Sequence, residues 1–223
     1  NTYTGDTSVT EGTLRLANTS GSATGLGAVT TSTGTTLSGI GAIVAAADKS
    51  VSISGSLSVG NGGDTVGSLM SLGTSGTGSI TINGPLSFDI FSGQGSGIEN
   101  GATTADRLAI SSSQNFVIGV GSTLNLSTAL PIDGSWVAGT SWRLFDWAGL
   151  TGGAAVTGAF SNLTGTIGNF DYLPDLGGQS LAWDVSQIYS QGLISVVIIP
   201  EPSRALLLLI GLMVLLLRRR RSV

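Results

Sequence analysis

Short segments in which apolar and polar residues alternate recur through the first 60 residues of this chain. Leu14 and Leu16 share one face of their segment, as do Leu57 and Val59, while Ser, Thr or Arg occupies the other face. Glycine, asparagine or aspartate separates most segments. The segments are 12–17, 27–30, 34–39, 41–44, 50–54 and 55–59. Because strands this short cannot bury an apolar face alone, we expect an all-β chain whose segments stack into a parallel β-solenoid.

The segment from Tyr3 to Leu14 reads Tyr-Thr-Gly-Asp-Thr-Ser-Val-Thr-Glu-Gly-Thr-Leu, and Gly-x-Val-Thr and Gly-x-Thr-Leu segments follow it. This pattern resembles the autotransporter-associated β-strand repeat as far as about residue 60. The resemblance implies a right-handed parallel β-helix, the fold of autotransporter passenger regions.

The pattern changes along the rest of the chain. We expect residues 1–104 to form the solenoid repeats and residues 105–199 to form the region that closes it, since aromatic residues concentrate there. The predicted strands beyond residue 60 are 66–72, 78–82, 85–91, 106–110, 115–120, 122–126, 141–147, 156–160, 170–174, 181–185 and 193–199.

The last two dozen residues have a different character. An apolar run from Ala205 to Leu217 contains no polar side chain, and Arg204 and Arg218 flank it. Thirteen apolar residues are few for a bilayer, and a buried core helix is the alternative. Four consecutive arginines at positions 218–221 favour a single transmembrane helix over 203–219, whose long basic side chains reach the interfaces. The positive-inside rule then places the C-terminus in the cytoplasm and residues 1–199 outside.

A short motif, an apolar span and a terminal basic cluster follow one another in this tail. Together they resemble the PEP-CTERM sorting signal. The closing region, with its Trp-Arg-Leu-Phe-Asp and Ala-Trp-Asp segments, resembles the C-terminal segment of β-strand-repeat proteins that carry a PEP-CTERM tail. The predicted sorting motif is Pro200, Glu201, Pro202 and Ser203, and the membrane-flanking residues are Arg204, Arg218, Arg219, Arg220 and Arg221. The resemblance implies recognition by an exosortase-like enzyme, removal of the tail, and transfer from the inner membrane to the cell surface or extracellular matrix. A plain membrane anchor is the alternative.

Charge and composition exclude several classes of function. Outside the tail the chain has four basic and twelve acidic residues, so nucleic-acid binding is not expected. The chain contains no histidine and no cysteine, which removes Ser-His-Asp catalysis, disulfides and most zinc sites. We therefore expect no enzyme activity, no cofactor and no metal site. Export requires a signal peptide, so we expect that one was removed before Asn1 or that the sequence is a fragment.

Some carboxylates could still suggest chemistry. Asp171 and Asp175 lie four residues apart, and such a pair would serve a glycosidase only if both faced a groove at the right separation. The favoured interpretation is that both are turn residues whose carboxylates bind backbone amides. The Gly/Asp-rich turn 61–64 resembles a calcium-binding repeat but occurs once, so an ordinary turn is favoured.

Arginine and tryptophan residues raise two further possibilities. Arg107 beside Asp106 and Arg143 near Asp146 could suggest a polysaccharide lyase, yet alternation places both arginines on the solvent face. Four tryptophans could stack on sugars, but packing in the core is favoured. They are Trp136, Trp142, Trp147 and Trp183.

Three functions remain from this reasoning. The first is a structural or matrix protein of the bacterial surface, which extracellular polysaccharide could contact. The second is a carbohydrate-binding adhesin on the same scaffold, and the third and weakest is a β-helix enzyme that cleaves polysaccharide.

Overall fold

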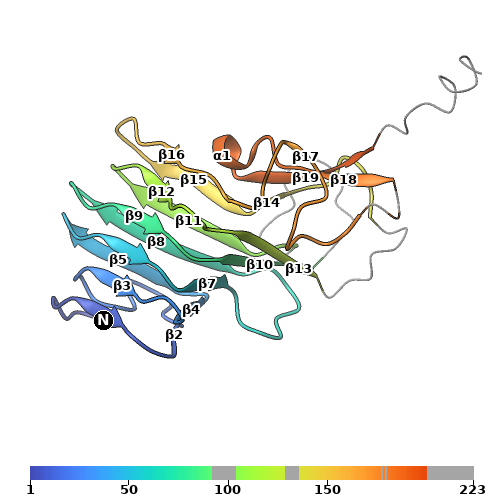
Figure 1. Ribbon diagram of the computed structural model, residues 1–223. Coiled ribbons are helices and arrows are strands. Elements are labelled where there is room, and N and C mark those ends of the chain that lie inside the picture. The colour runs from blue at the N-terminus through green and yellow to red at the C-terminus, as the bar shows by residue number, and fades with distance from the viewer. Residues whose placement is uncertain (92–103, 129–135, 177, 179, 200–223) are drawn as a thin grey trace, which may run out of the picture.

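Three parallel sheets form the walls of the molecule, and a small antiparallel sheet lies at its C-terminal end (Figure 1). The computed structural model describes residues 1–91, 104–128, 136–176, 178 and 180–199. The described chain is mostly β, with one helix of four residues, α1 (Ile188–Gln191).

Within each of the three parallel sheets, neighbouring strands follow one another in the order of the sequence. Sheet A contains β1 (Thr7–Val9), β3 (Val29–Thr31), β6 (Val51–Ile53), β9 (Ile80–Ile82), β12 (Phe116–Ile118) and β16 (Val156–Thr157). Sheet B contains β2 (Thr13–Leu16), β4 (Thr36–Gly39), β7 (Ser56–Val59), β10 (Leu86–Ile90) and β13 (Leu124–Thr128). Sheet C contains β5 (Ala42–Ala47), β8 (Leu69–Ser75), β11 (Arg107–Ser112) and β15 (Phe145–Leu150).

Successive passes through these sheets are the coils of the structure. Thr7 pairs with Val29 and Val29 with Val51, so the first coils advance by 22 residues at each step. The predicted parallel pairing between successive turns is confirmed, because every strand pair within sheets A, B and C is parallel. The arrangement is consistent with a β-solenoid.

Columns of identical or similar apolar side chains fill the interior. In sheet B the first inward column is leucine in every coil, and all but the first of these leucines are fully buried. The column is Leu14, Leu37, Leu57, Leu86 and Leu124. Each leucine thus packs on the leucine above and below it, which explains why the alternating pattern repeats along the chain.

The C-terminal end is covered by sheet D, in which β14 (Ser141–Arg143), β19 (Leu193–Ile198), β18 (Leu181–Asp184) and β17 (Ile167–Gly168) are neighbours in that order. The pairings β14–β19, β19–β18 and β18–β17 are antiparallel. The Trp147 indole N–H donates to the Ile188 carbonyl at 3.0 Å, which ties sheet C to α1.

The side chain of Asn162 covers the last strand of sheet B at Leu124. The Asn162 amide accepts from the Leu124 N–H at 2.9 Å and donates to the Leu124 carbonyl at 2.8 Å. It thereby takes the place of a neighbouring strand at the edge of β13.

Two predicted strands need correction, and one short helix was missed. The strand predicted over 141–147 is two strands, β14 and β15, because the chain passes from sheet D to sheet C at Leu144. No strand lies over 170–174, where Tyr172 has a φ of 66° and its carbonyl accepts from the Leu126 N–H. Helix α1 was not predicted, since four residues carry no clear helical period.

The predicted transmembrane segment 203–219 lies outside the described residues. Within the described part of the chain, no helix has the length and apolar character needed to cross a membrane.

Candidate functional site

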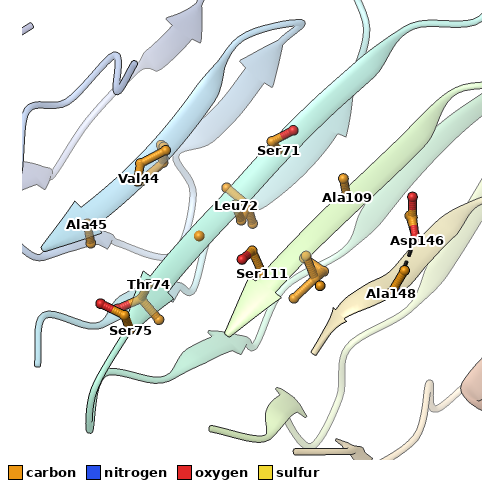
Figure 2. Close-up of a pocket in the computed structure, with 14 residues that line it drawn as sticks. Val44, Ala45, Ser71, Leu72, Thr74, Ser75, Ala109, Ser111, Asp146 and Ala148 are labelled. Atoms are coloured by element: carbon orange, nitrogen blue, oxygen red, sulfur yellow. Dashed lines mark hydrogen bonds between the residues drawn. The ribbon is translucent and has the colours of Figure 1, made fainter. Parts of the chain in front are cut away.

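A groove lies on the outer face of sheet C (Figure 2). It has a volume of about 430 Å³ and crosses β5, β8, β11 and β15. Alternation along these strands turns the core residues inward and leaves mostly small side chains outside. The outward side chains and the glycine in the groove are Val44, Ser71, Gly73, Ser75, Ala109, Ser111, Asp146 and Ala148. The groove thus has a shallow floor of small residues.

Two irregularities in strand pairing flank this floor. Between Val44 and Ala47, β5 has one residue more than β8 opposite it. Between Asp146 and Gly149, β15 likewise has one residue more than β11. Since an extra residue bends its strand and increases the local twist, these bulges account for the hollow between the two outer strands.

The chemistry available in the groove is limited. Asp146 is the only ionisable residue among those that line it, and its carboxylate accepts from the Ala148 N–H at 3.1 Å. The other polar side chains are serine and threonine hydroxyls. General acid–base catalysis needs a proton donor or acceptor poised against a second group, and Asp146 is one such group among the lining residues.

Asp106 is the most strongly perturbed carboxyl group that the structure describes. It is fully buried at the corner before β11, where it accepts from the Ser68 N–H at 2.9 Å and the Asp89 N–H at 3.0 Å. Burial raises the pKa of Asp106 to about 7; the two amide donors oppose this rise, while the Asp89 and Asp64 carboxylates add to it. The group therefore holds a corner of the solenoid together, and sequence reasoning did not find this role because its partners lie 17 and 38 residues away.

The described hydrogen bonds of the two Asp–Arg combinations go to other groups. Asp106 faces inward, whereas Arg107 is half-buried on the opposite face of its strand. Arg143 donates to the Gln191 carbonyl at 3.2 Å, and the Asp146 carboxylate accepts from the Ala148 N–H within the bulge of β15. The prediction that Arg107 and Arg143 lie opposite the apolar positions of their strands is confirmed.

The other carboxylates considered as candidates in the sequence lie outside the strands. Asp171 and Asp175 are exposed, and the Asp171 carbonyl accepts from the Asn162 amide at 2.7 Å. In the turn 61–64, Asp64 accepts from the Asn61 N–H at 2.7 Å and from the Ser68 hydroxyl at 3.0 Å. Across the described ranges, no group of three or more His, Cys, Asp or Glu residues is placed to hold a metal ion.

All four tryptophans are buried, with at most 9% of the surface of any one exposed. Trp136, Trp142 and Trp183 contact one another with ring centroids 5.5 to 5.8 Å apart, and Trp147 stacks on Phe145 at 4.6 Å. These rings form the core beneath sheet D, as the favoured interpretation predicted. The alternative, that they stack on sugar rings, is wrong for these four residues because their faces are already covered.

The predicted sorting motif and the arginines that flank the apolar span, residues 200–204 and 218–221, lie outside the described residues. Comparison with known proteins finds no family model, no curated protein and no solved structure that matches this chain.

Proposed function

We propose that this chain is an exported structural protein of the bacterial surface or extracellular matrix, delivered by its C-terminal tail. The observation that carries the proposal is the order of three features at the end of the sequence: Pro200-Glu201-Pro202, the apolar run 205–217, and Arg218–Arg221. Each feature alone is common, but the three in this order are typical of a PEP-CTERM signal.

The physical properties of the tail agree with such processing. Prolines at positions 200 and 202 disfavour helix at Ile199 and Glu201, so we expect an extended motif ahead of the span. A helix over 203–219 would hold the motif at a fixed depth in the inner membrane, and the arginines would keep the C-terminus in the cytoplasm. An exosortase-like enzyme would then meet a rigid segment at the outer surface of the membrane.

The body supports a structural role rather than a catalytic one. Parallel ladders continue from β1 to β16 in a mostly β chain, and we propose that they wind with the right hand typical of parallel β-helices. The carboxylates with assigned contacts bind backbone amides or nearby hydroxyls and lysine, as Asp106, Asp64 and Asp6 do. A rod of this kind, with a formal net charge of −8 before the tail, suits a hydrated polysaccharide matrix.

A carbohydrate-binding adhesin is the second candidate function, and the groove on sheet C favours it. Its apolar floor and serine hydroxyls could accept a flat polysaccharide chain. The test is binding of extracellular polysaccharide by two variants. If Ala109→Trp, which fills the groove, abolishes binding and Ser58→Trp on sheet B does not, the result favours this function over a purely structural one.

The sorting proposal is tested by the mass of the C-terminal fragment of the mature protein. In a host with an exosortase we expect a chain that lacks the tail, and in the same host without the enzyme a chain that still ends at Val223. Alanine at positions 200–202 should block processing but leave membrane insertion intact. Substitution of Arg218–Arg221 should instead disturb orientation first. An intact tail in both hosts would show that the segment is only an anchor.

A further inference from the structure

We propose that a pocket on the outer face of sheet D binds a neutral sugar unit. The pocket has a volume of about 330 Å³ and lies over β14, β19 and β18, beside α1. This volume falls in the range of small-molecule sites, roughly 300–1,000 Å³. The pocket is distinct from the groove on sheet C, since the two share no lining residue. The proposal does not depend on processing of the tail.

Strand register brings three polar side chains into one row across this face. Ser195 on β19 lies opposite Ser141 on β14 and opposite Asp184 on β18. Residues directly opposite each other have their side chains on the same face, with Cβ atoms about 5 Å apart. Because the adjacent Trp142 and Trp183 are fully buried in the core, alternation turns this half-buried row toward solvent.

The row and the neighbouring helix together supply hydrogen-bond acceptors and donors. Asp184 is the only ionisable residue among the described residues that line the pocket, and its Oδ1 accepts from the Ser186 N–H at 2.8 Å. Gln187 and Gln191 are exposed and line the same pocket. Each glutamine amide offers two N–H donors and a carbonyl acceptor. A carboxylate that accepts and amides that donate suit a ligand with several neighbouring hydroxyl groups.

The floor of the pocket is partly apolar. Leu193 and Val197 flank Ser195 on the same face of β19, and both line the pocket. A sugar ring carries C–H groups on its faces and hydroxyl groups at its edge. The apolar floor would therefore contact the ring while the polar row fixes its orientation, which is the usual division of roles in a small-molecule site.

The same side chains disfavour charged ligands. An anion would meet the Asp184 carboxylate, and the described lining residues include no lysine or arginine. The nearby Arg143 donates instead to the Gln191 carbonyl at 3.2 Å. A calcium ion takes roughly six to eight oxygen ligands, commonly from several carboxylates, whereas the described lining residues provide one carboxylate.

The position of the pocket also disfavours a peptide strand. An extended peptide adds to the exposed edge of a sheet, where it pairs with backbone groups. Ser195, at the centre of the polar row, belongs to β19, which lies between β14 and β18. The pocket therefore offers side chains on a sheet face rather than a free strand edge.

Binding of single sugar units by the full-length chain tests the proposal. The probes are methyl glucoside, methyl galactoside and methyl mannoside, added in a zwitterionic detergent whose head group carries no sugar. We expect at least one probe to shift the backbone amide signals of Ser141, Asp184 and Ser195 in a saturable manner. Glucuronate and glucosamine are the charged comparisons. If no neutral probe shifts these signals, or if only a charged sugar does, the proposal is wrong.

Two substitutions then assign binding to the polar row. Asp184→Asn keeps an acceptor for the Ser186 N–H but loses the charge, so it should weaken binding at least ~5-fold, because charge-assisted hydrogen bonds are about twice as strong as neutral ones. Ser195→Ala should weaken binding at least ~3-fold. Asp171→Asn, on an exposed loop, is the matched control and should bind as the parent does.

Unchanged affinity in either folded pocket variant would overturn the proposal. Should Asp184→Asn fail to fold, Ser195→Ala alone decides. The mass of the C-terminal fragment is measured separately, so a failure of sugar binding and a failure of tail processing are distinguishable.

Discussion

Asp106 should make the stability of the body fall as the pH rises from acid to neutral. Its native pKa is about 7, against an ordinary value of 3.8. Between these pH values the folded chain keeps a proton that the unfolded chain has released, and binding this proton stabilises the fold. The stabilisation is complete below pH 3.8 and is lost as the pH passes 7. A difference of about three pKa units corresponds to roughly 4 kcal/mol, at about 1.4 kcal/mol per unit, and relaxation of the surroundings around the charged form makes this an upper bound.

The measurement is the free energy of unfolding in urea at pH 4, 5.5 and 8, followed by fluorescence of the buried tryptophans. Asp106→Asn removes the titrating group and leaves one of the two amide donors poorly paired, which costs about 1–3 kcal/mol at every pH. The parent should therefore lose stability across this range relative to Asp106→Asn. Asp171→Asn, on an exposed loop, should keep the dependence of the parent. Parallel pH curves for the parent and Asp106→Asn would refute the reasoning.

Two further substitutions test the packing of the stack. Leu57→Ala, in the middle of the leucine column, should lower the free energy of unfolding in urea by about 2–5 kcal/mol. Ser58→Ala, on the outer face of the same strand, should change it by less than about 0.5 kcal/mol. Equal effects of the two would contradict the inward and outward assignment. Asn162→Asp keeps the acceptor for the Leu124 N–H but loses the amide donors, so Asn162→Ala should speed hydrogen exchange at Leu124 more than Asn162→Asp does. If neither variant changes the exchange rate at Leu124, the Asn162 side chain does not protect this edge.

The sequence predicted the parallel stack because the apolar columns are visible as local alternation. Leu57 and Val59 point inward as expected. Leu57 pairs with Leu37, which lies 20 residues earlier at the same place in its own segment. Local pattern and long-range pairing therefore agree in this part of the chain. Beyond residue 59 the steps lengthen, and alternation alone no longer shows which strands pair.

The strand predicted over 141–147 was wrong because its residues belong to two sheets. Trp142 faces the core from sheet D and Phe145 faces it from sheet C. Leu144 and Phe145 are consecutive buried residues, which a single strand with alternating faces does not allow. That pair was a signal in the sequence that the strand predicted over 141–147 had to be divided.

The buried carboxyl group could not be recognised by this reasoning. Asp106 is adjacent in sequence to Arg107, and that adjacency suggested a lyase-like combination rather than a buried carboxyl group. In the folded chain the two side chains leave opposite faces, and the groups that bind Asp106 come from the turn before β8 and from β10. Its pKa depends on the stacking of coils and on no local motif.

The groove on sheet C shows why the candidate site was missed altogether. Each bulge exists only relative to the neighbouring strand: β5 has its extra residue against β8, and β15 has its extra residue against β11. The alternation of β5 or β15 read alone predicts a strand but cannot reveal that its partner is one residue shorter. The hollow and its floor at Gly73 are therefore consequences of register between segments about 30 to 40 residues apart. Catalytic motifs are sought among neighbouring residues, so a surface produced by register escapes such a search even where every strand is correctly predicted.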